Sequence, residues 1–150
     1  MAEAALAGDP ATRVPVAYKV VHELRAVETE PKLRDLVERL RGCVTFDDRK
    51  VLYSWIGATR RDWRGQGHFR ALTEESETWA HALGFHEVVV KTKNRFYDMR
   101  AVLAQLGFDV VKFERHAVGA AESKVYLSKQ LGADLVRGHR SRRTVVQAGA

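Results

Sequence analysis

The fold is decided by the stretch KVLYSWIGAT (residues 50–59), RRDWRGQG (residues 60–67) and HFRALTEESETWAHALG (residues 68–84). The first part is rich in β-branched and aromatic residues and apolar on both faces, which predicts an interior strand. Gly57 within it predicts a bulge or the close approach of another group. The last part has the one-sided apolar pattern of a helix that begins near His68. A charged loop therefore joins a buried strand to a helix.

The loop has the composition of an anion-binding turn. A helix N-terminus leaves free N–H groups and carries a partial positive charge. Gly65 and Gly67 remove the side chains that would keep an anion away from those groups. Four arginines flank the turn against one acid, Asp62. They are Arg60, Arg61, Arg64 and Arg70. We expect a pocket for a phosphorylated ligand, with an ordinary surface turn as the alternative. The loop is neither a Walker A motif nor a GxGxxG motif.

Two elements are expected before this stretch. Residues 14–24, VPVAYKVVHEL, alternate as a strand does. The predicted apolar face consists of Val14, Val16, Tyr18, Val20, His22 and Leu24. On that face, His22 is expected to be a hydrogen-bonded core histidine. Residues 29–41 predict a helix with Thr29 as its N-cap and an apolar stripe that serves packing alone.

The rest of the chain completes a mixed α/β sheet flanked by helices. Further strands are expected at residues 86–92, 108–114 and 123–128, and a further helix at residues 95–106. Residues 2–6 are a candidate for a short partner strand. A short helix at most is expected before the C-terminal tail. Without repeats or linkers, one domain is the simplest division of the chain.

Composition excludes several classes of protein. The 150 residues are 45% hydrophobic and 29% charged, enough for one domain with a real core. Apolar runs are far shorter than the ~20 residues of a membrane span. The first ten residues lack the basic stretch of a secretory signal, so a cytoplasmic location is the default expectation. The one cysteine and six unpaired histidines predict no disulfide and no metal site.

The net charge of +6 is unevenly distributed. Residues 129–150 carry +4 of it, and the other 128 residues carry only +2. Residues 132–150 are therefore expected to form a basic, flexible C-terminal tail. A nucleic-acid partner would depend mainly on that tail, which makes this alternative weak.

The loop resembles motif A of the GNAT superfamily, the acyl-CoA-dependent N-acyltransferases, in which (Gln/Arg)-x-x-Gly-x-(Gly/Ala) stands at the same strand-to-helix junction. Here the motif reads Arg64-Gly65-Gln66-Gly67-His68-Phe69, with Phe69 in place of a small residue. The string KTKNRFYDMRAVLAQLGFDVV also resembles a GNAT subgroup. The resemblance covers residues 14–131 and implies a mixed, splayed sheet flanked by helices, in one acyl-CoA-binding domain over residues 1–131.

The resemblance also implies roles for individual residues. The loop amides from residue 64 to residue 69 would bind the pyrophosphate of acetyl-CoA, the co-substrate. These residues are Arg64, Gly65, Gln66, Gly67, His68 and Phe69. The strand end at Ala58, Thr59 and Arg60 would pair with the pantetheine arm, and Asn94 would orient that arm. The thioester would lie between strands 52–59 and 86–92.

Acetyl transfer to an amine needs a base, because an alkyl ammonium has a pKa of ~10.4 and must lose its proton before it attacks. Glu23 is the first candidate, with a solvated edge carboxylate as the alternative. Many relatives protonate the leaving thiolate with a tyrosine, and Leu103 stands at that position here. Tyr97 is a possible substitute, although packing on the sheet is the alternative. Trp55 and Tyr53 would fill the core or line the acceptor pocket.

The N-terminal half departs from the GNAT pattern. The first strand and two helices of the family are short or missing, with residues 2–6 as the only candidate strand, and the helix at 30–41 replaces a hairpin turn. The acceptor, a small-molecule or peptide amine, could be held by a truncated site, by a second subunit of a homodimer, or by that helix. A CoA-binding or partner-binding module without turnover is the main alternative to an enzyme.

Overall fold

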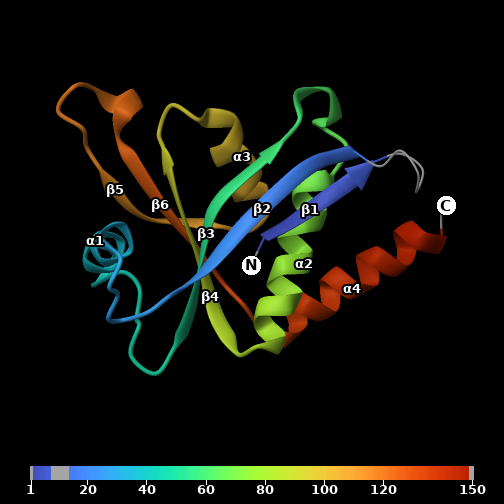
Figure 1. Ribbon diagram of the computed structural model, residues 1–150, viewed down its shortest axis with the longest axis horizontal. Coiled ribbons are helices and arrows are strands. Elements are labelled where there is room, and N and C mark those ends of the chain that lie inside the picture. The colour runs from blue at the N-terminus through green and yellow to red at the C-terminus, as the bar shows by residue number, and fades with distance from the viewer. Residues whose placement is uncertain (1, 8–13, 149–150) are drawn as a thin grey trace. The chain divides into compact units, whose positions relative to one another are not determined.

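The computed structural model describes residues 2–7 and 14–148. They form two compact units, and Figure 1 labels the helices and strands. Unit 1 contains residues up to 22 together with 54–85 and 131 onward. Unit 2 contains residues 23–53 and 86–130. No helix in the described part of the chain has the length and apolar character needed to cross a bilayer.

The strands form a six-stranded mixed sheet in the order β1-β2-β3-β4-β6-β5, with helices packed against it. The strands are β1 (Ala2–Ala7), β2 (Val14–Leu24), β3 (Lys50–Thr59), β4 (Phe85–Lys93), β5 (Asp109–Glu114) and β6 (Lys124–Gln130). The helices are α1 (Pro31–Leu40), α2 (His68–Ala82), α3 (Tyr97–Gln105) and α4 (Ala133–Ala148), with short 3-10 turns η1 (Arg61–Trp63) and η2 (Ala120–Glu122). The predicted α/β class and element order are confirmed. β1 pairs antiparallel with β2, so the short partner strand exists.

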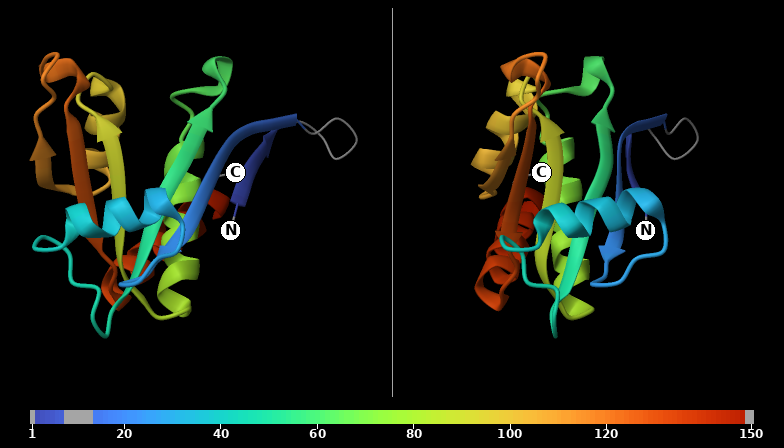
Figure 2. Two further views of the ribbon diagram at one scale, coloured as in Figure 1. Left: turned by 60° about the vertical axis from the view of Figure 1, so that its left-hand side comes forward. Right: turned by 90° about the vertical axis from the view of Figure 1, so that its left-hand side faces the viewer.

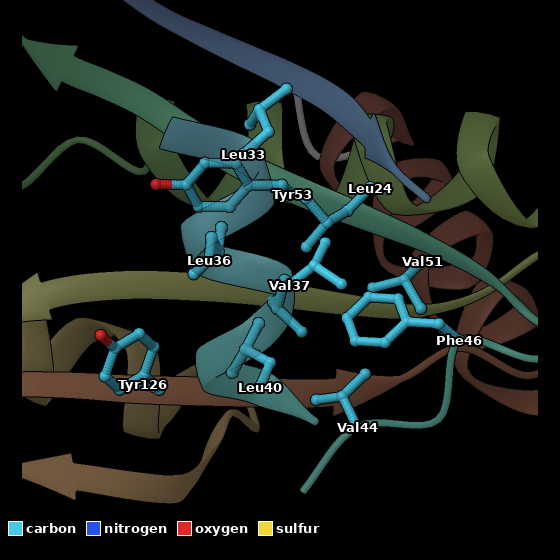
Figure 3. Close-up of a cluster of buried hydrophobic side chains, with 11 residues drawn as sticks. Leu24, Leu33, Leu36, Val37, Leu40, Val44, Phe46, Val51, Tyr53 and Tyr126 are labelled. Atoms are coloured by element: carbon cyan, nitrogen blue, oxygen red, sulfur yellow. The ribbon is translucent and has the colours of Figure 1, made fainter. Parts of the chain in front are cut away.

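The core of unit 2 lies under α1, which crosses β4 and β6 (Figure 2). Leu33, Leu36, Val37 and Leu40 repeat at helical spacing and are all buried. They form one buried cluster with Val51, Tyr53 and Tyr126 of the strands (Figure 3). Val89 of β4 belongs to the same cluster. The predicted packing role of this helix is confirmed. Its N-cap is Glu30, whose carboxylate accepts from the N–H of Leu33 at 2.9 Å, so the assignment of Thr29 is wrong.

The buried face of β2 differs from the expected one. His22 is exposed and Tyr18 is 45% exposed, whereas Ala17, Lys19 and Val21 are buried. Lys19 tolerates burial because its ammonium group donates to Thr73 Oγ1 at 3.0 Å, so a polar partner replaces the lost water. The expected buried face of β2 is therefore wrong around these residues, and His22 is not a core histidine.

The C-terminal segment also differs from expectation. The 16-residue helix α4 packs against α2 within unit 1, so the prediction of a short helix at most is wrong. Val136 and His139, three residues apart on this helix, are buried. His139 Nε2 lies 2.7 Å from Glu77 Oε2 of α2, while Arg137 and Arg140 remain exposed. Counting charge alone misses the inward-facing side of this helix.

Candidate functional site

The turn between β3 and α2 belongs to unit 1 and is fixed by main-chain contacts. The Arg60 N–H donates to Val16 O at 2.7 Å, which ties the end of β3 to β2. Arg64 Nε then donates to Thr59 O at 3.2 Å, across η1. The chain enters α2 through Gly67, whose carbonyl accepts from the N–H of Ala71 at 2.9 Å. The turn is therefore held on both sides.

Two glycines open the top of this turn. Gly65 and Gly67 have φ values of 77° and 82°, in the left-handed region that favours glycine. Among the described residues, apart from the two chain neighbours of each glycine, no atom lies within 4 Å of where their Cβ atoms would be. Gly67 is the N-cap of α2 and supplies no side-chain cap. Within the described residues, none of the N–H groups from 65 to 70 has a hydrogen-bond acceptor. The turn thus offers unblocked donors at a helix N-terminus, the arrangement that binds phosphate groups.

The arginines around the turn are not equivalent. Within the described part of the chain, the guanidinium groups of Arg60 and Arg61 make no hydrogen bond or ion pair, so they can turn toward a ligand. Arg64 is held by Thr59 O. Arg70 pairs with Glu74 one helical turn away at 3.5 Å, which offsets its charge. The excess positive charge is greatest before the turn rather than inside the helix.

Phe69 fits the turn because β3 has no side chain opposite it. A Cβ on Gly57 would lie 3.2 Å from Phe69 Cε2 and 3.4 Å from Tyr18 O. The ring also lies under the ammonium group of Lys19, 5.1 Å from the ring centroid. The predicted close approach at Gly57 is confirmed. Phe69 can therefore stand where motif A has a small residue, because Gly57 of β3 has no side chain and leaves space for the ring.

His68 brings an unsatisfied buried nitrogen to the turn. Its Nε2 atom is buried without a hydrogen-bond partner among the described residues, and its ring packs edge-on against Trp63 with centroids 6.1 Å apart. A buried polar atom without a partner costs stability. A ligand oxygen or a water molecule at the turn would satisfy it.

The predicted pantetheine edge is partly occupied by the chain itself. The main-chain N–H of Arg60 and the carbonyl of Thr59 both have partners within unit 1. Ala58 is exposed and Thr59 is half-buried. These two main-chain groups are therefore not free to pair with a ligand in this conformation.

Asn94 lies in unit 2, where its side chain holds the loop before β6. Its Nδ2 donates to Ala120 O at 3.0 Å, its Oδ1 accepts from Arg100, and its own N–H donates to Ser123 O at 2.8 Å. Within the described ranges, Arg100 keeps a buried Nε atom without a partner. Asn94 thus orders η2, and its predicted role toward a cofactor stays a prediction.

The candidate proton-transfer residues differ in exposure. Tyr97, in the first turn of α3, is 64% exposed, so packing on the sheet is not its role. Leu103 is 1% exposed, and this position is a core position. Glu23 pairs with Arg25 at 3.3 Å and its side chain is 32% exposed, so the carboxylate stays reachable from solvent. Tyr53 is buried, while Trp55 is 49% exposed.

Sequence reasoning missed a polar group at the end of the unit 2 core. Lys91 of β4 lies opposite Tyr126 of β6, and Lys124 lies two residues before that tyrosine. The signal that could have found them is the alternation of lysines in VVVKTK, once its register against β6 is known. By contrast, no cluster of three metal-ligating side chains exists in the described ranges.

Comparisons with known proteins identify the fold. No family model matches the chain, and no curated protein matches it. Among solved structures, the NatC complex bound to Gag peptide and CoA matches with a TM-score of 0.65 and 14% identity, covering 87% of this chain and 71% of that one. Arabidopsis thaliana NAA60 in complex with acetyl-CoA matches at 0.61 and 11%, covering 78% and 66%.

A third match is the ribosomal-protein-S18-alanine N-acetyltransferase from Escherichia coli, with a TM-score of 0.54 and 16% identity. It covers 79% of this chain and 63% of that one. The chain thus spans about two thirds of the length of these enzymes. The mixed sheet and its helices match the fold of the GNAT acetyltransferases, and identities this low show the fold alone.

Proposed function

We propose that the chain is an N-acetyltransferase that moves an acetyl group from acetyl-CoA to a primary amine. The observation that carries the proposal is the turn at residues 65–70, where N–H groups without partners among the described residues lie beside two left-handed glycines that have open space at their Cβ positions. A fold shared with acetyltransferases determined with CoA or acetyl-CoA bound supports the same proposal.

The residues at the turn suit the coenzyme. Its pyrophosphate would accept hydrogen bonds from the N–H groups of residues 65–70, and Arg60 and Arg61 would add charge that reaches it from the side. His68 Nε2, which lacks a partner in the described part of the chain, would gain one there. The exposed end of β3 near Ala58 would lie along the pantetheine arm. Asn94 would act indirectly, through the loop that it orders.

The acceptor amine would attack the thioester carbonyl directly, and the resulting oxyanion would be stabilised by a main-chain N–H. The amine must first lose a proton. Glu23 is the proposed acceptor of that proton, directly or through a water chain, because its carboxylate remains partly open to solvent beside Arg25. Tyr97, a largely exposed residue, is the proposed proton donor to the departing thiolate.

The direct test is titration calorimetry with acetyl-CoA on wild type and on Gly67→Glu. We expect wild-type binding and at least a 100-fold loss in the variant, because a carboxylate at the turn repels the pyrophosphate and closes the cradle. Gly42→Glu is the matched control: Gly42 also has positive φ and open space at its Cβ, but it ends α1 in unit 2. Binding that survives Gly67→Glu would place the coenzyme elsewhere.

The second candidate is a module that binds CoA without turnover. The buried Leu103 in the position of the family tyrosine favours it. Release of free thiol from acetyl-CoA, measured over a panel of amines, separates the two. Tight binding without release from any amine would support the module, whereas amine-dependent release that falls in Tyr97→Phe would support the enzyme.

The basic tail does not favour a nucleic-acid function. Arg137 pairs with Asp134 at 2.8 Å, and Arg142 pairs with Glu74 at 3.0 Å. These pairs offset part of the charge that the sequence concentrates there, and α4 contributes buried residues to unit 1.

A further inference from the structure

The core of unit 2 has a polar end. The hydroxyl groups of Tyr53 and Tyr126 both point to the same end of the apolar cluster (Figure 3). The Tyr126 hydroxyl donates to Glu114. Tyr53 makes no such bond within the described residues, although only 5% of the residue is exposed. The hydroxyl of an almost wholly buried residue is therefore left with hydrogen-bonding capacity to spare.

Strand register places two lysines on the same face as these tyrosines. Lys91 lies directly opposite Tyr126, and Lys93 lies opposite Lys124. Residues directly opposite on paired strands share a face, and side chains two apart on one strand do so too. Tyr126 packs under α1, so Lys91 and Lys124 lie on that same face, toward the carboxyl end of β4.

The carboxylates nearby are already paired with other cations. Arg39 of α1 binds Asp35 at 2.8 Å and Glu114 at 2.7 Å. Lys112 Nζ donates to the carbonyl of Arg39 at 2.6 Å and lies 3.9 Å from Glu114. Both acids are thus held by one arginine.

Neither Lys91 nor Lys124 has an ion-pair partner in the part of the chain that the structure describes. Lys93, the next lysine on the same face of β4, differs because it pairs with Glu122 at 2.7 Å. Lys91 is exposed, yet partial loss of water around its ammonium group, followed by the charge of Lys124, lowers its pKa. The two lysines repel each other, and an anion bound beside them would relieve that repulsion.

We propose that Lys91 and Lys124, with the free hydroxyl of Tyr53, bind an anionic group of the acceptor, so that the substrate is an amine that also carries a carboxylate or a phosphate. This inference rests on the proposed acetyl transfer. Two ammonium groups and a hydroxyl donate hydrogen bonds, and charged lysines accept none, which selects an anion over a neutral or cationic group.

The first experiment measures binding without turnover. Lysines of the full chain are reductively methylated with ¹³C, which keeps their charge, and their NMR signals are followed during titration with O-phosphoethanolamine, β-alanine and ethanolamine. We expect the Lys91 and Lys124 signals to move with one or both anionic amines and to stay unchanged with ethanolamine. The exposed Lys32 of α1 serves as the internal control. Signals that stay still with both anions, or that move equally with ethanolamine, would overturn the proposal.

The comparison of the two anionic probes identifies the group. A larger response to O-phosphoethanolamine indicates a phosphate, and a larger response to β-alanine indicates a carboxylate. Lys91→Gln and Lys124→Gln should each weaken the binding of the preferred probe about tenfold, the size expected for one lost charge-assisted hydrogen bond. Lys32→Gln removes the same charge elsewhere and should leave the affinity unchanged.

Acetyl-CoA is titrated into the same variants, which separates failure of this inference from failure of the proposed function. If Lys91→Gln and Lys124→Gln bind acetyl-CoA as wild type does but lose the anionic probe, the lysines recognise the acceptor. If wild type binds the probe but not acetyl-CoA, the result supports the anion site and contradicts the proposed acetyltransferase function. Equal rates of thiol release with matched neutral and anionic amines would contradict the anion site but leave the proposed acetyl transfer supported.

Discussion

The helices of units 1 and 2 are packed by different kinds of side-chain contact. In unit 2, α1 meets the strands through aliphatic and aromatic side chains (Figure 3). In unit 1, α2 meets α4 through Glu77 and His139, which are 1% and 3% exposed. Arg142 Nη2 donates to His139 Nδ1 at 2.6 Å, so by geometry the Nε2 atom carries the proton that bonds Glu77. An apolar contact tolerates exchange of similar shapes, whereas this chain of hydrogen bonds depends on each partner.

The largest effect should come from breaking the polar contact on one side only. Glu77→Ala should lower the free energy of unfolding by about 3–5 kcal/mol, because His139 then keeps a buried N–H without an acceptor, which costs about 1–3 kcal/mol, and the missing side chain leaves a cavity in a buried contact. Urea denaturation measures the loss. Glu77→Gln, which retains an acceptor oxygen, should lose less. Replacing both Glu77 and His139 with leucine should restore much of the stability, and a double variant worse than Glu77→Ala would contradict this account.

The apolar contact should respond to lost volume. Leu36→Ala removes a side chain that is 2% exposed, and we expect a loss of about 3 kcal/mol from transfer and cavity terms together. The loss should be the same at pH 6 and pH 8, since no charge is involved. Val27→Ala, at a residue 83% exposed, is the control and should change stability by less than about 0.5 kcal/mol. A strong pH dependence for Leu36→Ala would show that the two contacts are not distinct.

The smallest effect should appear at the polar end of the unit 2 core. Burial raises the pKa of Glu114, but hydrogen bonds from Tyr126 and Arg39 outweigh it, so the pKa lies below the ordinary value. A depressed pKa stabilises the fold above the unfolded value of about 4.3, and that stability is lost as pH falls through the folded value. Glu114→Gln should therefore cost about 1 kcal/mol at pH 7 and less below about pH 4.

The control for that measurement is Glu75→Gln on α2, since Glu75 is exposed and has no partner within the described residues. Its effect should be near zero at both pH values. A cost for Glu114→Gln that grows in acid would mean that folding raises the pKa of Glu114 instead of lowering it.

The same contrast explains what the sequence could predict. The limits of β2 and β3 and the packing stripe of α1 follow from apolar spacing, which is a local signal. Gly65 and Gly67 identify the turn because positive φ favours one residue type. A site built from main-chain groups can therefore be located by residue type and spacing alone.

The contacts between polar side chains could not be predicted from the sequence, for a different reason. The buried face of β2 depends on Lys19 finding Thr73, which lies 54 residues away. The pairing of α4 with α2 and the neighbourhood of Lys91 and Lys124 likewise depend on contacts distant in sequence. No periodicity within one segment encodes them, because the partner that makes burial of a polar group favourable lies on another element.

The contact between Gly57 and Phe69 has a consequence for recognising related chains. Either residue by itself departs from a pattern that treats every position separately, yet together they fill one space. In related chains, a large side chain could move from the helix position to the strand position only if both residues changed together. An intermediate with large side chains at both positions would clash. A sequence search can score the two positions together, requiring a glycine twelve positions before an aromatic residue that follows Gly-x-Gly-His. We expect such a search to find related chains that a profile scoring each position independently would miss.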